Sequence, residues 1–127
     1  MSQLEETLAL QLRALKLPGC EREYRLFAHH VGLGPEIKQR LKDAGFKDFR
    51  FDFAFPEQKL LIEIQGGAWM AGKTGHTSGS GFSRDIKKAH DAMALGFNVY
   101  ACDGALIKSG QAVELIEKLV NQLSQNP

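Results

Sequence analysis

The sequence of 127 residues predicts one α/β domain, an α-β-(α)-β-β-α-β-α sandwich around a central mixed sheet. Three observations predict it. Leucines at helical spacing open the chain, two strand-like runs separated by a short connection form a hairpin in its middle, and a helical segment followed by an apolar run precedes a last amphipathic helix. Because neither an internal repeat nor a linker divides the chain, residues 1–127 are expected to fold as one domain.

The first predicted helix covers residues 3–16, where leucines recur at Leu4, Leu8, Leu12 and Leu15. Ser2 is its expected N-cap, and Pro18-Gly19 is expected to stop it. A short strand is expected over residues 23–28. The other elements outside the hairpin are predicted, in chain order, as a helix over residues 35–44 with Gly45 just past its end, a loop over residues 66–81, a helix that Ser83 caps and Gly96 ends, a strand over residues 97–102 and a helix over residues 110–124.

The hairpin pairs residues 49–55 with residues 59–65, because so short a connection leaves the two runs little choice but to pair. Since side chains alternate along a strand, one face should carry Phe51, Phe53 and Phe55 and the opposite face Asp52. Glu63 and Gln65 share one face of the second run. Two carboxylates and an amide can therefore converge, and such oxygen ligands suit a hard cation such as Mg²⁺. Strand-end acids facing solvent are the alternative, which the mostly apolar surroundings disfavour.

Composition restricts the classes of protein that need to be considered. A hydrophobic share of 43% with 24% charged residues is ordinary for a soluble globular protein. The net charge of +1 is unlike that of a strongly basic nucleic-acid binder, so any such binding must use a local patch. Cys20 and Cys102 match neither a zinc pattern nor a disulfide framework, which indicates two reduced thiols in a cytoplasmic protein. We find no signal peptide and no run long enough for a membrane span, so no membrane partner is expected.

Four stretches then occur in a characteristic order. They are Glu5-x-x-Leu8-x-x-x-Leu12-Arg13 followed by Leu17-Pro18-Gly19, Phe51-Asp52-Phe53-Ala54, Leu61-Ile62-Glu63-Ile64-Gln65-Gly66-Gly67, and Asp85-x-x-Lys88 followed by Leu95-Gly96-Phe97-Asn98-Val99. This order of a helix, a hairpin carrying Asp and then Glu-x-(Lys/Gln), a helix and a strand resembles the PD-(D/E)XK nuclease superfamily. Within it, the chain is most similar to the small bacterial and phage branch that includes the very-short-patch mismatch-repair endonucleases. The likeness spans most of the chain except residues 29–47, and it implies a restriction-endonuclease-like fold.

The resemblance implies a Mg²⁺-dependent endonuclease that hydrolyses DNA phosphodiesters and leaves a 5′-phosphate and a 3′-hydroxyl, with Mn²⁺ as a substitute metal. Asp52, Glu63 and the main-chain carbonyl of Ile64 would hold the ion. Glu5 would add a carboxylate directly or through water, although a first-turn helix acid favoured by the helix dipole is an equal alternative. The ion would lower the pKa of a bound water and stabilise charge on the phosphate.

One departure concerns the position of the usual catalytic lysine, where this chain has Gln65. Gln65 can orient a water or a phosphate but supplies no charge. Some relatives carry the lysine on the following helix, and Lys88 occupies the corresponding place, so we predict it to be the cation that faces the phosphate. A solvated helix lysine is the ordinary alternative. His76 could shuttle a proton or orient the water, although a loop histidine without a role is the better expectation.

Contacts to DNA, the expected partner, are predicted from cations around the following loop and helix. Lys73, Arg84 and Lys87 are candidates for backbone phosphates, with a solvated surface as the ordinary alternative. Trp69 could stack on a base, although a core anchor is the preferred interpretation. A homodimer is plausible, because one site cuts one strand and duplex cleavage needs two. Mismatched, branched, single-stranded and duplex DNA all stay open as substrates, and so does RNA.

Two alternatives belong to other functional classes. Residues Gly67 to Thr74 fit the Walker A pattern G-x-x-x-x-G-K-[ST] and follow a strand, which would indicate a nucleotide-binding P-loop. A P-loop needs a helix that begins at Lys73-Thr74, and the glycines at 75, 79 and 81 disfavour one there. We therefore rank it second and expect no organic cofactor. The other alternative is a catalytically inactive DNA-binding module with a nuclease fold.

Overall fold

The structure, a computed structural model, describes residues 2–65 and 78–125, with side chains described through Gln65 and again from Asp85. Within these residues, four strands form one mixed sheet in the order β1-β2-β3-β4. Their bounds are β1 Glu21–Tyr24, β2 Phe51–Phe55, β3 Leu60–Gln65 and β4 Asn98–Asp103. β2 is antiparallel to β1 and to β3, whereas β3 and β4 are parallel. The predicted α/β class and the mixed sheet are confirmed.

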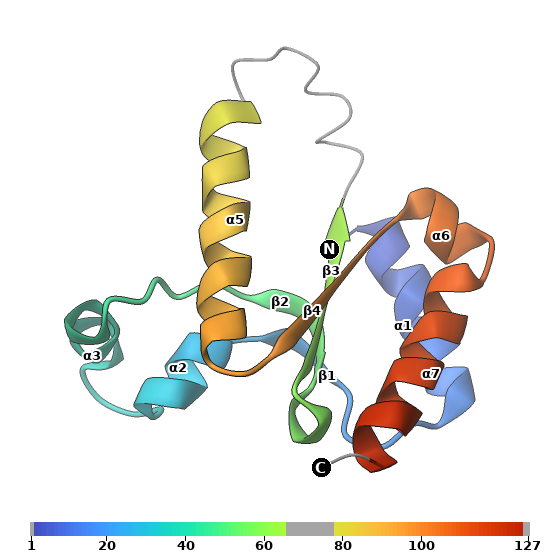
Figure 1. The fold of residues 1–127 in the computed structure, drawn as a ribbon, viewed down its shortest axis with the longest axis horizontal. Helices are drawn as coiled ribbons and strands as arrows, with labels where there is room; N and C mark the ends of the chain where they lie inside the picture. The colour runs from blue at the N-terminus through green and yellow to red at the C-terminus, as the bar shows by residue number, and fades with distance from the viewer. Residues whose placement is uncertain (1, 66–77, 126–127) are drawn as a thin grey trace.

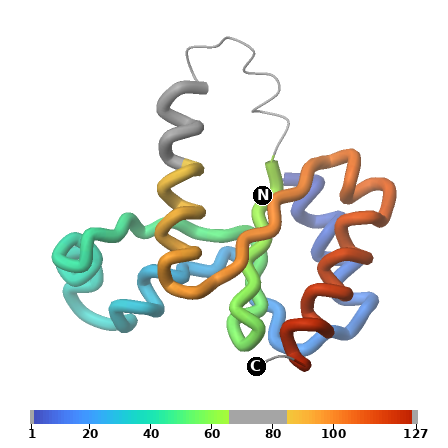
Figure 2. The backbone as a smooth tube through the Cα atoms, viewed as in Figure 1, coloured from blue at the N-terminus to red at the C-terminus, as the bar shows by residue number. Residues whose placement is uncertain are grey.

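Helices cover both faces of the sheet (Figure 1). One face carries α1 (Gln3–Leu15), α6 (Gly104–Lys108) and α7 (Gln111–Gln125). The opposite side carries α2 (Leu26–Val31), α3 (Ile37–Ala44) and α5 (Ser78–Ala94), and a 3-10 turn, η1 (Pro56–Gln58), joins β2 to β3. The backbone trace places α1 and α7, from the two ends of the chain, on the same side of the sheet (Figure 2). None of the described helices combines the length and apolar character that a bilayer span requires.

Each face of the sheet has its own hydrophobic core. The first core packs α1, α6 and α7 on strand residues that include Phe53, Phe55 and Ile62. The second core packs α2, α3 and α5 on Phe51, Ala54 and Leu61. Because Asp52 lies between residues that belong to different cores, its position is set by packing on both faces of the sheet.

Local sequence signals account for several elements. Ser2 caps α1 as predicted, because its Oγ accepts the N–H of Glu5 at 3.0 Å. Gly45 adopts φ 82 directly after α3, which agrees with its predicted place past the helix end. Asp103 caps α6 by accepting the N–H of Leu106 at 3.0 Å, and this short helix was not predicted.

Two of the predicted elements and one predicted face need correction. The strand expected over residues 23–28 lies at Glu21–Tyr24, and residues 26–31 form α2 instead. Leu26, Phe27 and Ala28 are buried in the second core, where a short apolar run can pack as a helix as well as a strand. α5 begins at Ser78 rather than Ser83, because extending a helix adds a hydrogen bond per residue and glycine is only a weak obstacle. Phe51 does not share a face with Phe53 and Phe55.

Candidate functional site

The site begins where the pairing of β2 with β3 ends. Phe53↔Ile62 is the last register pair at this end of the two strands. Beyond it, Glu63 Oε1 accepts the N–H of Asp52 at 3.2 Å, and Asp52 Oδ2 accepts the N–H of Ile64 at 2.7 Å. Side-chain oxygens therefore take the place of ladder bonds between the strands, and the hairpin brings Asp52 and Glu63 together as predicted.

Lys88 reaches this gap from α5. Its Nζ lies 2.7 Å from Glu63 Oε2, and the two side chains are only 13% and 18% exposed. The same ammonium lies 4.5 Å from the centroid of the Phe51 ring, a distance typical of a cation–π contact. Packing of Phe51 in the second core thus explains both the wrong prediction of its face and the aromatic wall beside Lys88. The structure places the predicted lysine in contact with Glu63.

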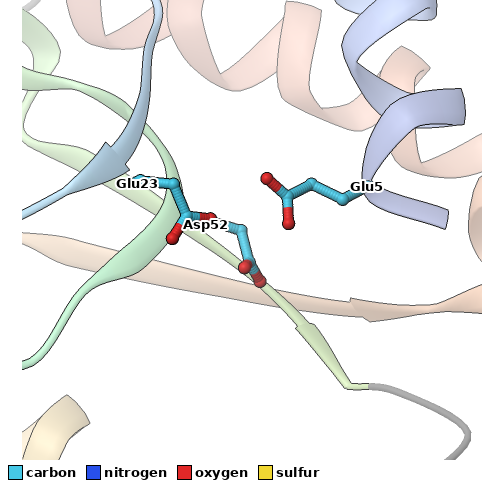
Figure 3. A group of neighbouring side chains, drawn as sticks. All are labelled: Glu5, Glu23 and Asp52. Carbon is cyan, nitrogen blue, oxygen red and sulfur yellow. The ribbon is translucent and has the colours of Figure 1, made fainter. Parts of the chain in front are cut away.

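Asp52 also belongs to a group of three carboxylates. Oxygens from Glu5 on α1, Glu23 on β1 and Asp52 on β2 lie within 4.8 Å of one another, and the three side chains point toward a common space (Figure 3). Glu5 is buried, Asp52 is partly buried and Glu23 is exposed. Glu63 is outside this group and pairs with Lys88. The candidate metal ligands in the structure are therefore Asp52, Glu5 and Glu23, whereas the sequence predicted Asp52 and Glu63 as the carboxylate ligands.

Arg22 on β1 forms ion pairs with two acids of α1 beside the carboxylate group. Its guanidinium lies 3.0 Å from Glu5 Oε2 and 2.8 Å from Glu6 Oε2, and it also stacks over the Phe53 ring at 5.5 Å from the centroid. Glu5 therefore lies between one cation and two further carboxylates. The site draws on both helical layers, because Glu5 comes from α1 on one face of the sheet and Lys88 from α5 on the other.

Burial and mutual repulsion disfavour the charged forms of these acids. Burial raises the pKa of Asp52 above its ordinary value, and the charge of Glu5 adds to this against the opposing effects of the Ile64 N–H and Lys88. Burial also raises the pKa of Glu63, although Lys88 opposes it. Partial desolvation, a hydrogen bond with Glu5 and the charges of Glu5 and Asp52 raise the pKa of Glu23. A cation placed among these carboxylates would relieve the repulsion, as expected for a metal site.

Glu23→Gln is expected to stabilise the metal-free protein at pH 7 and to leave its stability unchanged near pH 4. The pKa of Glu23 is raised in the folded state, so wild-type stability falls as pH rises from about 4 through the folded pKa. The gain should stay below about 1 kcal/mol because the side chain is exposed. Urea unfolding in EDTA measures it, with Glu21→Gln on the same strand as control. A gain at pH 4 as large as at pH 7 would contradict the assignment.

The other predicted residues fall into three groups. Gln65 is exposed at the end of β3, and within the described part of the chain no hydrogen bond joins its side chain to Asp52, Glu63 or Lys88. Lys87 is 46% exposed and pairs with Asp91 at 2.9 Å, so its contact with a DNA phosphate stays a prediction. The predicted residues outside the described parts are Trp69, Lys73 and His76, the side chain of Arg84, and the Walker-like segment Gly67 to Thr74.

Sequence reasoning missed Glu23 and Arg22. Glu23 adopts φ 50 within β1, a left-handed conformation that costs a non-glycine residue about 1 kcal/mol or more. Arg22 stacks over Phe53 of the first core, whereas Tyr24 belongs to the second core. Alternation along the strand is therefore interrupted at Glu23, and a face assignment from spacing could not place it. The available signal was the acid-base-acid order of Glu21, Arg22 and Glu23, in the strand that α2 and α3 separate from the hairpin carrying Asp52.

The two thiols do not form part of this chemistry. Cys20 and Cys102 are both free. Burial raises the pKa of each thiol to about 11, so both are protonated near neutral pH and unsuited to act as nucleophiles.

Comparison of the chain with protein-family models, with curated proteins and with solved structures yields no match. The geometry of the site and the order of its residues in the chain are therefore what indicates a function.

Proposed function

We propose that this protein is a Mg²⁺-dependent endonuclease of the PD-(D/E)XK type, with a restriction-endonuclease-like fold, that hydrolyses DNA phosphodiester bonds and accepts Mn²⁺ in place of Mg²⁺. The observation that carries the proposal is the arrangement of Asp52 and Glu63 at the separated ends of β2 and β3, with Lys88 on Glu63 and two further carboxylates beside Asp52. The element order around it, helix, hairpin, helix and parallel strand, supports the same family.

The donor set suits a hard divalent cation. Opposite ligands of a Mg²⁺ ion are about 4.2 Å apart when each lies about 2.1 Å from it. The oxygens of Glu5, Glu23 and Asp52 lie within 4.8 Å of one another, so small side-chain movements would bring them to an ion. Asp52 and Glu5 would hold it, with Glu23 directly or through water. When bound, the ion would supply an acidified water and charge stabilisation on the phosphate.

Lys88 would supply the fixed positive charge of the site. Its short contact with Glu63 holds the ammonium beside the strand end, and the Phe51 ring limits its movement. A preorganised cation in a partly buried site stabilises developing negative charge more effectively than one in water. Lys88 on α5 would then replace the usual lysine at the position of Gln65, because its ammonium lies at the same end of β3.

A catalytically inactive DNA-binding module is the second candidate. It is favoured by the ion pairs that already neutralise two of the acids, Arg22 with Glu5 and Lys88 with Glu63. Such pairs can hold the carboxylates in place without an ion. The two candidates differ in one property, since only the enzyme cleaves nucleic acid in the presence of a divalent metal.

A cleavage panel with the wild-type protein tests the proposal. The substrates are mismatched, branched, single-stranded and plain duplex DNA, with RNA of the same sequence, each in Mg²⁺, in Mn²⁺ and in EDTA. We expect cleavage of at least one DNA substrate with either metal and none in EDTA, with 5′-phosphate products. Binding without cleavage in every metal would favour the inactive module. Size-exclusion chromatography of the active species tests the proposed homodimer.

A further inference from the structure

A basic groove runs beside the carboxylate group. Its volume is about 350 Å³, and it lies between α1, the turn that follows α1, and the start of the sheet. Its apolar side includes Ala9, Leu12 and Leu17, and its polar side includes Arg13, Lys16 and Arg22. The groove therefore combines an apolar wall with Arg13 and Lys16, while its third cation, Arg22, is paired with Glu5 and Glu6.

Arg13 and Lys16 give the groove a local positive charge that the small net charge of the chain does not indicate. Arg13 and Lys16 are exposed, and within residues 2–65 and 78–125 neither has an acid within ion-pair distance. A second groove, about 440 Å³, lies beside α7 and is lined by both Glu114 and Lys118. The overall net charge is only +1. The cations beside α1 are thus a local feature, of the kind expected where an anion binds.

Arg22 connects the groove to the proposed catalytic site. It lines the groove and at the same time donates to Glu5 Oε2 at 3.0 Å. Phe53, at the base of the groove, directly follows Asp52. Arg13 lies eight residues beyond Glu5 on α1, about 12 Å along the helix axis. A polyanion whose phosphate reached Asp52 could therefore continue along the groove past Arg13 and Lys16.

We propose that this groove binds an unpaired DNA strand next to the phosphate that is cut, with backbone phosphates on Arg13 and Lys16 and the base or sugar of one nucleotide on the apolar wall. This inference rests on the proposed nuclease function and narrows its substrate to DNA with an unpaired segment at the site. The volume is at the lower end of about 300–1,000 Å³ for small-ligand pockets. It matches one nucleotide and is too small to enclose a base pair.

Binding in EDTA tests the proposal without any requirement for cleavage. The variant is Arg13→Ala combined with Lys16→Gly, which should fold, because Lys16 adopts φ 56 after α1, a conformation that glycine favours. The matched control is Lys118→Ala beside the second groove. Fluorescence anisotropy measures the affinity for a short labelled single strand and for the matching duplex over a series of salt concentrations.

The double variant should bind the single strand at least about tenfold more weakly at low salt. The slope of log affinity against log salt should fall by about 1.4, since each lost phosphate contact on a single strand contributes about 0.7. Lys118→Ala should behave as the wild type, and duplex binding should change far less. Wild-type binding by the double variant, an equal loss in Lys118→Ala, or an equal loss for the duplex would overturn the proposal.

The test separates this inference from the proposed function. Cleavage by the wild type together with unchanged binding by the double variant would reject the groove and keep the nuclease. Groove-dependent binding of the single strand without cleavage in any metal would reject the nuclease and keep the groove.

Discussion

Asp52→Asn is expected to reduce metal-dependent DNA cleavage at least about 1,000-fold, equivalent to ~4 kcal/mol of transition-state stabilisation. Asp52 connects the end of β3 with the carboxylate group. It accepts the N–H of Ile64, and it belongs to the group with Glu5 and Glu23. The amide can still accept the N–H of Ile64, but it lacks the charge that holds an ion. Single-turnover cleavage of a labelled substrate measures the effect.

The same substitution should leave the protein folded. The raised pKa of Asp52 means that its ionisation opposes folding as pH rises above about 4, and asparagine removes that cost. Unfolding in urea at pH 7, in EDTA, should therefore show stability equal to or above the wild type. Asp43→Asn is the control, because Asp43 is exposed on α3 and its carboxylate accepts a hydrogen bond from Gln39, away from the site. Cleavage by Asp52→Asn at the rate of Asp43→Asn would remove Asp52 from the reaction.

Lys88→Met is expected to slow cleavage about 100-fold, whereas Lys87→Met should change it by less than about twofold. Lys88 lies 2.7 Å from Glu63 in a mostly buried pair, whereas Lys87 is 46% exposed and pairs with Asp91 on the helix surface. The two lysines are adjacent in sequence and carry the same charge, so a general electrostatic effect would act on both alike. Equal effects of the two variants on the single-turnover rate would exclude Lys88 from the site.

Lys88→Met should also lower the stability of the protein. Removing Lys88 leaves Glu63 without its ion-pair partner, and breaking such a buried pair costs about 3 kcal/mol or more. The pKa of Glu63, already raised by burial, should rise further, so the loss of stability should grow as pH increases above about 4. The double variant Glu63→Gln with Lys88→Met should recover much of this stability and still cleave at least about 100-fold more slowly than the wild type. Recovery of cleavage in the double variant would show that Lys88 has only a structural role.

The parts of the fold that sequence reasoning predicted correctly are those fixed by local signals. Ser2 predicts the start of α1, and the short connection between two strand-like runs predicts the hairpin of β2 and β3. A hairpin places residues near its open end at similar positions on adjacent strands, which is why Asp52 and Glu63 could be paired in advance. Lys88 was placed by the resemblance, since the contact with Glu63 depends on how α5 packs.

The parts that could not be predicted depend on breaks in regular geometry. Glu23 joins the carboxylate group from a left-handed position within β1, and no spacing rule indicates such a residue. Phe51 leaves the face of Phe53 to pack with Phe27 in the second core, although alternation predicted otherwise. Tertiary packing overrides local preference at both positions. Both lie beside the candidate site, where departures from regular structure are expected to concentrate.

Calorimetric titration of Mn²⁺ into the protein without DNA shows whether these acids bind a divalent ion, which the proposed nuclease requires. The wild type should bind Mn²⁺ more tightly as pH rises from about 4, because carboxylates of raised pKa must ionise to hold the ion. Asp52→Asn should lose that binding, and Asp43→Asn should retain it. A wild type that binds no ion, or an Asp52→Asn variant that binds it equally well, would contradict the account.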